Sequence, residues 1–218
     1  MTNRQSPWVR HDWQGSAFDF HAMNPAPTRA LWWCTVQAPA IILGSTQQTG
    51  DVDAAAAADL GLEVVRRRSG GGAVFVHPTE SVWMDITIPR DDPLFVDDVS
   101  ASMLWLGDVF CEALSPWVQA ETYRGEFTAG AYGRSVCFAS TSPGEVFVGD
   151  HKLVGISQRR GRDGARLQCV LYRSWSPELW VSSLTATDVR EQISSLSVAT
   201  ISADAADIVS AVFDALPV

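Results

Sequence analysis

Arg66-Arg67-Arg68-Ser69-Gly70-Gly71-Gly72-Ala73-Val74 is the stretch of this chain that says most about its fold and chemistry. Three arginines run directly into three glycines, between segments 63–68 and 73–76, which we predict to be β-strands. Glycine lets a backbone approach a ligand closely, and successive free N–H groups with guanidinium groups beside them suit phosphate or carboxylate oxygens. The stretch therefore predicts an anion site, with a plain hairpin turn after a solvated strand end as the alternative.

A single lysine is the second informative feature. The chain contains 15 arginines and one lysine, Lys152, within the β-like run Val148-Gly149-Asp150-His151-Lys152-Leu153-Val154-Gly155-Ile156-Ser157-Gln158. A compositional bias explains the missing lysines, but it does not explain why this one remains. An ammonium group on a flexible stem can approach a point charge in ways that a planar guanidinium cannot. We predict that Lys152 is functional, with survival by chance as the alternative.

Together these segments resemble the lipoate–protein ligase A family, within a wider group that includes biotin ligases and octanoyl transferases. The family's first signature, Arg-Arg-x-Ser-Gly-Gly-Gly-Ala-Val, is present from Arg66 to Val74. Its second combines a lysine, a glycine and a glutamine, present here as Lys152, Gly155 and Gln158. The apolar run 40–47, which ends in Gly-x-x-Gln, is a weaker third match. The resemblance covers about residues 28–183.

The resemblance implies a ligase that activates lipoate with ATP, releases pyrophosphate, and transfers the lipoyl group to a lysine of an acceptor protein. It places Lys152 between the acyl carbonyl and the α-phosphate, where the ammonium would neutralise developing charge. Mg²⁺ would accompany ATP, although the sequence contains no evident metal-ligand cluster. The resemblance assigns cofactor binding to Arg68, Ser69, Gly70, Gly71, Gly72, Ala73, Val74, Phe75, Val76, Lys152 and Gly155.

The resemblance also implies the partners of such an enzyme. The acceptor would be a lipoyl domain of a 2-oxoacid dehydrogenase or the H-type protein of the glycine cleavage system. The chain has no room for the family's separate C-terminal accessory domain, so a separate accessory subunit is possible. Two departures bear on acceptor choice and acyl binding. The family's histidine after the glycine turn is shifted to His77, and a Gln-His-Gly stretch is replaced by Gln168-Cys169-Val170.

A rival interpretation rests on Cys137. Octanoyl transferases of the same group use a cysteine in a Cys-Phe stretch to form an acyl-thioester without ATP, and Cys137-Phe138 precedes Lys152 by a similar spacing. A thiolate beside a cation would have the lowered pKa that a nucleophile needs. A buried apolar cysteine is the alternative, and it is the interpretation that we favour for Cys34 and Cys111. Cys169, on the predicted strand after the lysine, is intermediate.

Two further classes stay open. A biotin ligase would carry a Gly-Arg-rich loop before its lysine, whereas the similar run Gly161-Arg162-Asp163-Gly164-Ala165-Arg166 follows Lys152. A non-catalytic cofactor-binding protein is the other. The tryptophans Trp32, Trp33 and Trp83 either pack the core or line a tunnel for an acyl chain.

Composition sets limits on these alternatives. A chain of 218 residues with 46% hydrophobic residues can form one domain with a full core. A net charge of −9 argues against nucleic-acid binding, which needs a basic surface. The arginines at 66–68 and 159–166 are local exceptions and fit a small anion. The four cysteines have no disulfide-type or metal-type spacing, and we find no signal peptide and no apolar run of membrane length. We therefore expect a cytoplasmic protein without membrane contact.

The pattern along the chain predicts alternating groups of strands and helices. The first 28 residues are mixed and polar, and we assign no element to them. We expect strands at 32–36, 40–43, 63–68, 73–76, 81–89, 134–139, 145–149, 152–159 and 166–173. We expect helices at 52–60, from Asp97-Asp98 to about Leu114, from Pro177 onward, at 188–194 and at 203–216. This order predicts an α+β fold, in which residues 1–218 form a single domain with a mixed, largely antiparallel sheet flanked by helices.

Overall fold

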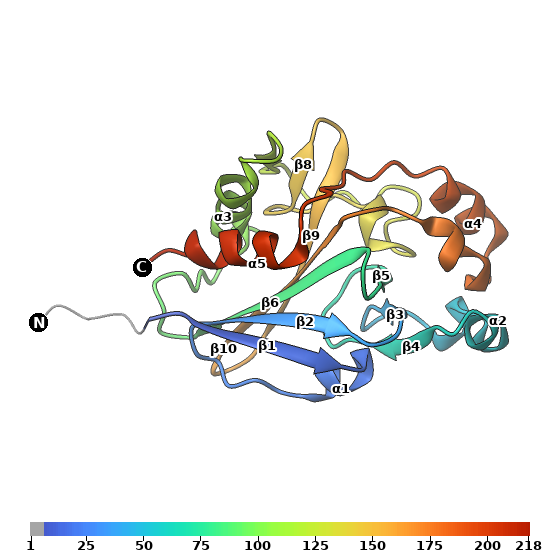
Figure 1. Ribbon diagram of the computed structural model, residues 1–218, viewed down its shortest axis with the longest axis horizontal. Coiled ribbons are helices and arrows are strands. Elements are labelled where there is room, and N and C mark those ends of the chain that lie inside the picture. Colours follow the sequence, from blue (N-terminus) through green and yellow to red (C-terminus); the bar gives the residue numbers. More distant parts are fainter. Residues whose placement is uncertain (1–6) are drawn as a thin grey trace, which may run out of the picture.

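The computed structural model describes residues 7–218, which form two β-sheets with helices packed around them (Figure 1). The large sheet has the strand order β1-β2-β6-β10-β9-β8-β7 and the small sheet has the order β4-β3-β5. The strands are β1 (Val9–Gly15), β2 (Ala30–Val36), β3 (Ala40–Leu43), β4 (Glu63–Arg66), β5 (Val74–Val76), β6 (Ser81–Pro89), β7 (Glu121–Thr122), β8 (Val146–Val148), β9 (His151–Arg160) and β10 (Gly164–Tyr172). The α-helices are α1 (Ala17–Ala22), α2 (Ala54–Asp59), α3 (Leu104–Leu114), α4 (Thr187–Ser194) and α5 (Ala205–Asp214).

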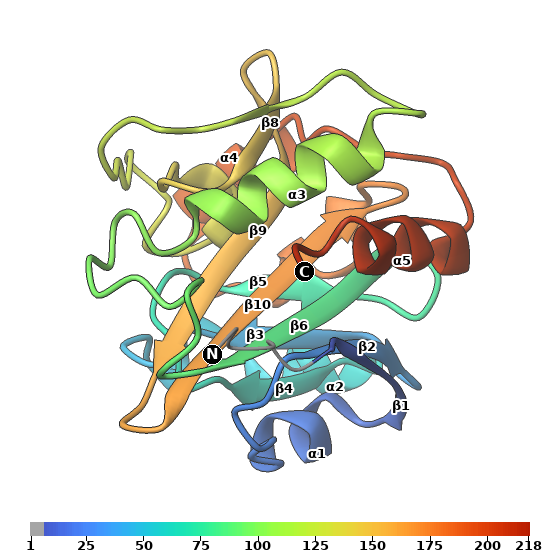
Figure 2. The ribbon, with the colours of Figure 1, turned by 90° about the vertical axis from the view of Figure 1, so that its left-hand side faces the viewer.

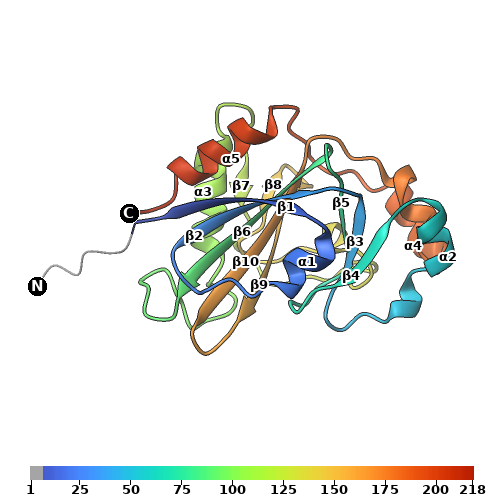
Figure 3. The ribbon, with the colours of Figure 1, turned by 60° about the horizontal axis from the view of Figure 1, so that its bottom comes forward.

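The large sheet is covered on both faces, as Figure 2 shows. Helices α3 and α5 cover one face, where Leu106, Phe110 and Val212 pack against strand residues such as Met84. Helix α1 and the small sheet lie against the other face, and α1 lies beside β4 (Figure 3). The central strands β6 and β10 are buried along almost their whole length. This explains why apolar residues occupy both faces of these strands. The polar exceptions are Asp85, Thr87, Arg166 and Gln168.

The glycine turn connects β4 to β5, but these strands are not neighbours. Strand β3 lies between them, parallel to β4 and antiparallel to β5. The turn therefore crosses the end of β3, and the side chain of Arg67 holds it there. The Arg67 guanidinium is 3% exposed, and it donates to the carbonyl oxygens of Ile42 (3.1 Å), Gly70 (2.8 Å) and Gly72 (2.8 Å). The stretch is thus a crossing between outer strands and not a hairpin.

Most of the predicted elements are present. The α+β class is confirmed, with mostly antiparallel pairs in the large sheet and parallel pairs only between β1 and β2 and between β3 and β4. Strands β3 and β6 have the predicted bounds, and β9 and β10 differ from prediction by one or two residues at their ends. Helices α4 and α5 lie within or beside their predicted ranges.

Three predicted elements were wrong. The helix expected from Pro177 onward is replaced by two short 3-10 turns, Pro177–Leu179 and Val181–Ser183. Residues 134–139 contain no strand; instead Cys137–Ala139 form one 3-10 turn, with the cap N–H of Ser140 bonded to the carbonyl of Cys137. The helix predicted from Asp97-Asp98 begins only at Leu104. The carboxylate of Asp98 accepts a hydrogen bond from the backbone N–H of Ser100. This bond stabilises a local turn, which competes with a helical conformation.

The polar N-terminal segment also contains structure that the pattern did not predict. Strand β1 pairs in parallel with β2 at the edge of the large sheet, and α1 follows it directly. Helix α1 is anchored by Glu63 of β4, whose carboxylate accepts the N–H groups of Ala17 and Phe18. Because β1 is an edge strand with alternating partial exposure, its sequence is mixed and carries no strong strand signal.

We predict that Gly44→Ala destabilises the protein by about 1–3 kcal/mol, because the added methyl group requires backbone displacement. A Cβ at Gly44 would lie 1.8 Å from the carbonyl oxygen of Gly71, so the turn or β3 would have to move. Urea unfolding monitored by tryptophan fluorescence measures this loss. Gly50→Ala is the matched control, because a Cβ there has no atom within 4 Å. Equal stability of the two variants would contradict the prediction.

Candidate active site

One face of the large sheet, which α1 and the small sheet cover, changes along its strands from apolar to polar to cationic residues. Facing residues of neighbouring strands point to the same side, so the register defines rows across β2, β6, β10 and β9. The first row is apolar, the second is polar, and the third ends in two arginines. The rows are Cys34, Trp83, Val170 and Gly155; then Trp32, Asp85, Gln168 and Ser157; then Ala30, Thr87, Arg166 and Arg159.

A cavity lies above the first two rows. It encloses about 350 Å³ of space including its opening to solvent, of which only about 20 Å³ admits the centre of a water-sized sphere, so the cavity is narrow. Its floor comes from β6, β9 and β10, and its other walls come from α1, the small sheet and the 137–139 turn. The lining residues are His21, Ile42, Arg67, Val74, Trp83, Cys137, Phe138, Gly155, Ser157, Gln168 and Val170. Most of these are apolar, so the cavity suits an acyl chain.

The glycine turn is bonded to this floor through Ser69. The Ser69 hydroxyl donates to Gln168 Oε1 (2.8 Å) and lies 3.2 Å from the Ser157 hydroxyl. Gly70 and Gly71 are exposed next to this anchor, and within residues 7–218 their backbone N–H groups meet no hydrogen-bond acceptor. Gly71 has a φ of +95°, which favours glycine. The turn is therefore held in place while it presents unused donors to solvent.

Three arginines gather beside these donors. Arg159 and Arg166 face each other across β9 and β10, and burial together with the charges of Arg68 and Arg166 lowers the pKa of Arg159. Arg166 is neutralised by an ion pair with buried Asp85. Within the described residues, Arg68 and Arg159 have no acidic partner; Arg159 donates only to the amide oxygen of Asn24 at 3.3 Å. Two adjacent unpaired guanidinium groups in an acidic protein favour a bound anion.

Lys152 lies behind the wall of the cavity. Its side chain is 2% exposed, and its Nζ donates to the carbonyl oxygen of Cys137 and to Glu145 Oε1, both at 2.8 Å. The ring of Phe138 lies 5.5 Å from Nζ. The lysine thus joins β9 to the 137–139 turn, directly next to the cavity, and Glu145 balances its charge.

Cys137 lines the cavity, but the expected activation of its thiol is absent. Burial raises the pKa of the Cys137 thiol, and the charge of Lys152 opposes this without reversing it. Burial is the largest effect, and the nearby charge of Glu145 raises the pKa further, while the ammonium of Lys152 is bonded to the carbonyl of Cys137 and to the Glu145 carboxylate. The prediction of a lowered pKa was therefore wrong. Cys34, Cys111 and Cys169 are free, and burial raises the pKa of each.

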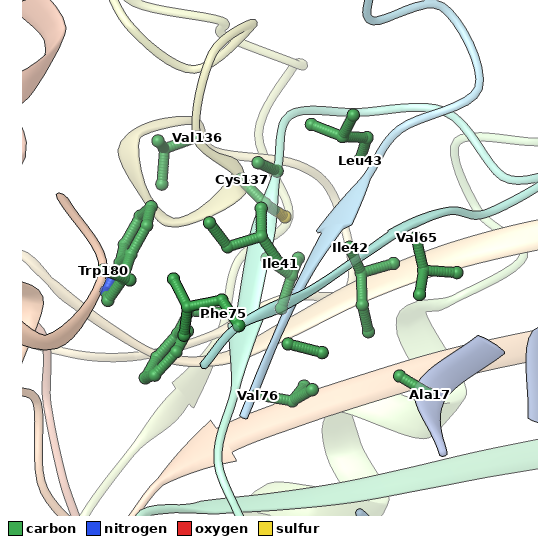
Figure 4. Packing of buried hydrophobic residues seen from close by; sticks show 14 of the residues in the cluster. Ala17, Ile41, Ile42, Leu43, Val65, Phe75, Val76, Val136, Cys137 and Trp180 are labelled. Carbon is green, nitrogen blue, oxygen red and sulfur yellow. The ribbon is translucent and has the colours of Figure 1, made fainter. Parts of the chain in front are cut away.

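The remaining predicted residues are divided between the cavity and the core. Val74 and Gly155 line the cavity, and a Cβ on Gly155 would lie 3.1 Å from the Phe138 ring. Phe75 and Val76 instead belong to the core of the small sheet, where Phe75 stacks on Trp180 with ring centroids 5.5 Å apart (Figure 4). The carbonyl of Phe75 already accepts the Tyr172 hydroxyl at 2.6 Å.

Ala73 connects the glycine turn to the 137–139 turn. Its N–H donates to Ser135, and its carbonyl accepts the N–H of Cys137, each at 2.9 Å. Of the tryptophans considered for a tunnel, Trp83 lines the cavity, whereas Trp32 packs against Phe20. Trp33 lies with the core on the other face of the sheet.

Four residues of the site were not singled out from the sequence. Arg67 resembles its neighbours in the arginine run, and only alternation along β4 could have indicated that it is the buried one. Arg159 belonged to a noted arginine cluster, but its place depends on the β9–β10 register. Glu145 belongs to the Pro143-Gly144-Glu145 stretch, whose spacing after Cys137-Phe138 resembles the transferase loop, but the sequence assigned it no role. His21 is isolated in the sequence and reaches the site only through the fold.

His21 is the one histidine on the cavity wall. Its ring stacks on Trp83 with centroids 5.0 Å apart, and its Nε2 is buried without a hydrogen-bond partner. Burial, with the nearby charges of Arg166 and Arg67, lowers the pKa of His21 to about 3. The imidazole is therefore neutral at physiological pH.

No group of three or more histidine, cysteine or acidic residues that could hold a metal ion occurs within residues 7–218. In the same residues, every helix is too short or too polar to cross a bilayer. The cavity and the glycine turn beside it therefore make up the candidate site.

The architecture is that of lipoate–protein ligases. Protein Ta0514 of Thermoplasma acidophilum, solved with bound lipoic acid, superposes with a TM-score of 0.71 at 13% identity, covering 97% of this chain and 84% of that one. A lipoate-protein ligase A bound with ATP gives 0.70 at 12% identity over 97% and 83%. A bi-partite ligase of T. acidophilum, from a study with its E2 lipoyl domain, gives 0.70 at 13% over 96% and 82%.

Sequence comparison identifies the family directly. The model of the lipoyl protein ligase A/B catalytic domain matches residues 7–216, so this chain belongs to that family. The match extends beyond residues 28–183, which carry the motifs, and includes β1, α1 and α5. No curated protein matches the chain.

We predict that His21 makes the protein less stable as the pH falls from about 6.5 toward 3. The unfolded state takes up a proton on His21 near pH 6.5, whereas the native state resists protonation until about pH 3. Within this window the unfolded state binds more protons, so this contribution to stability declines with falling pH by at most about 1.4 kcal/mol per pH unit. Urea unfolding of wild type and His21→Phe between pH 4 and 7.5 measures it. The two pH dependences should diverge below pH 6.5, and parallel curves would contradict the prediction.

Proposed function

We propose that this protein is a lipoate–protein ligase that works through an acyl-adenylate. The carboxylate of lipoate attacks the α-phosphorus of ATP, and pyrophosphate leaves with the electron pair of the broken P–O bond. The amine of an acceptor lysine then attacks the acyl carbonyl and displaces AMP, losing a proton as the amide forms. The carboxylate must be activated in this way because it does not react with an amine directly.

The observation that carries this proposal is the set of free donors beside the cavity. Gly70 and Gly71 present unused N–H groups, and Arg68 and Arg159 present guanidinium groups without acidic partners. A thioester-dependent transferase binds no triphosphate and releases no pyrophosphate. The donors fit the triphosphate of ATP or the phosphate of an adenylate. The resemblance also places the backbone of residues 73–76 beside the adenine, but the N–H and carbonyl of Ala73 and the carbonyl of Phe75 are bonded within the protein, so this contact would require them to be released.

Lys152 would stabilise the charge that develops on the reacting oxygens. It is a buried cation in contact with the wall of the cavity, where electrostatic interactions are stronger than in water. Its present bond to the Cys137 carbonyl implies that the 137–139 turn shifts when the substrate binds. Glu145 would hold the ammonium until then.

Other components follow from the same reaction. Mg²⁺ would enter with ATP, because the described residues provide no metal-ligand cluster of their own. The acceptor would be a lipoyl domain or an H-type protein, and a separate accessory subunit would take part if the isolated chain is inactive. A cytoplasmic location agrees with the free cysteines.

An octanoyl transferase is the second candidate, because Cys137 lines the cavity next to Lys152. Its thiol would attack an octanoyl thioester and pass the acyl group to the acceptor lysine without ATP. The raised pKa of the Cys137 thiol makes it a poor nucleophile in this arrangement. The same feature favours the ligase.

We predict that Lys152→Arg lowers the rate of lipoylation by about 10²-fold while the fold is retained, because a planar guanidinium cannot reproduce the contacts of the ammonium. Mass spectrometry of an apo-lipoyl domain incubated with lipoate, ATP and the variant measures the rate. Near-ultraviolet circular dichroism checks the fold. A rate within about threefold of wild type, well short of the loss expected for such a group, would exclude the assigned role.

The ligase and the transferase are distinguished by ATP–pyrophosphate exchange. We expect exchange that requires lipoate, falls about 10²-fold in Arg68→Gln and in Arg159→Gln, and is unchanged in Cys137→Ser. Arg10→Gln is the control, because Arg10 pairs with Asp12 on the edge strand β1. ATP-independent transfer from an octanoyl thioester, abolished in Cys137→Ser, would establish the transferase instead. Absence of both activities with any accessory subunit present would indicate a non-catalytic binding protein.

A further inference from the structure

An unpaired polar atom interrupts the apolar wall of the cavity. His21 Nε2 is buried and has no partner among the described residues. The surrounding side chains of Trp83, Ile42 and Val74 offer it none. A buried polar group without a partner destabilises a protein unless a ligand or water completes it. His21 Nε2 is therefore a polar atom on the cavity wall that a bound ligand could complete.

The position of His21 identifies which part of a ligand would meet it. Lys152, Ser157 and Arg159 all lie on β9, and the glycine turn reaches the same strand through Ser69. His21 stacks on Trp83 of β6, which is separated from β9 by β10. Two strand spacings correspond to about 10 Å. A ligand that reacts at β9 and lies along the first row therefore ends near His21.

We propose that His21 is a specificity-determining residue, which selects acyl chains with a hydrogen-bonding heteroatom near their far end over saturated chains of the same length. This inference rests on the proposed function, because that function places the reacting carboxylate at β9. A ring sulfur or a terminal oxygen would pair with Nε2, whereas a saturated chain would leave Nε2 buried and unpaired. Sulfur is the weaker partner, so oxygen gives the larger preference.

The neutral state of the imidazole makes this selection independent of pH in the physiological range. Because burial and the nearby arginines hold the pKa of His21 at about 3, the ring carries no charge between pH 6 and 8. It can then pair with an uncharged heteroatom without the desolvation cost of an ion. Arg166 is bonded to Asp85 and to the carbonyl of Phe20, so its guanidinium does not bind the far end of the acyl chain.

The test is direct binding of free acids to the full chain without ATP. Isothermal titration gives the dissociation constants of octanoate, 8-hydroxyoctanoate and lipoate for wild type, His21→Phe and His21→Gln. We expect wild type to prefer 8-hydroxyoctanoate over octanoate by about tenfold, with a smaller preference for lipoate. His21→Phe should abolish both preferences at unchanged or tighter octanoate affinity, and His21→Gln should restore part of them.

His11→Phe is the matched control. His11 also stacks on a tryptophan, with centroids 4.1 Å from Trp32, but it does not line the cavity. Equal preferences in wild type, His21→Phe and His11→Phe would overturn the inference, as would a failure of wild type to bind any of the acids. Lipoate-dependent ATP–pyrophosphate exchange decides the proposed function separately, so the two failures can be told apart. Loss of the preference in His11→Phe as well as in His21→Phe would also contradict the inference that His21 determines specificity.

Discussion

The buried guanidinium of Arg67 is the interaction on which the site depends. It bonds to the end of β3 and to two carbonyls of the glycine turn, so it fixes the crossing from β4 to β5. Only the absence of side chains allows this crossing, since the backbone at Gly71 passes directly over Gly44. The carbonyl groups of the turn are taken up by Arg67, and the N–H groups of Gly70 and Gly71 are left free. One buried cation thus fixes the orientation of the backbone of the turn.

The second organising feature is the register of the large sheet. It aligns apolar, polar and cationic residues in successive rows, so a single ligand can meet an apolar wall and a cationic end. Asp85 and Gln168 tie these rows together: Asp85 pairs with Arg166, and Gln168 accepts the Ser69 hydroxyl. The glycine turn, the floor of the cavity and Arg166 are therefore parts of one hydrogen-bonded unit.

Lys152 and Cys137 show how burial changes the meaning of a motif. Their spacing in the sequence suits a nucleophile beside a cation, and the fold does bring them together. However, the ammonium contacts the cysteine's carbonyl group and Glu145, and burial raises the pKa of the thiol. Burial thus opposes the thiolate that the sequence spacing suggested, while Glu145 places a carboxylate against the ammonium of Lys152.

The sequence by itself determined the family, the α+β class and most strands and helices, because glycine runs, apolar periodicity and helix-capping residues act over a few neighbouring positions. It also indicated the glycine turn and Lys152, whose residue types are distinctive. Only the tertiary structure decided that Arg67 is buried while Arg68 is free, that β1 and α1 complete the fold, and that His21, Glu145 and Arg159 join the site. These features depend on strand register and burial, which bring together residues as far apart as Ser69 and Gln168, and no local pattern encodes such contacts.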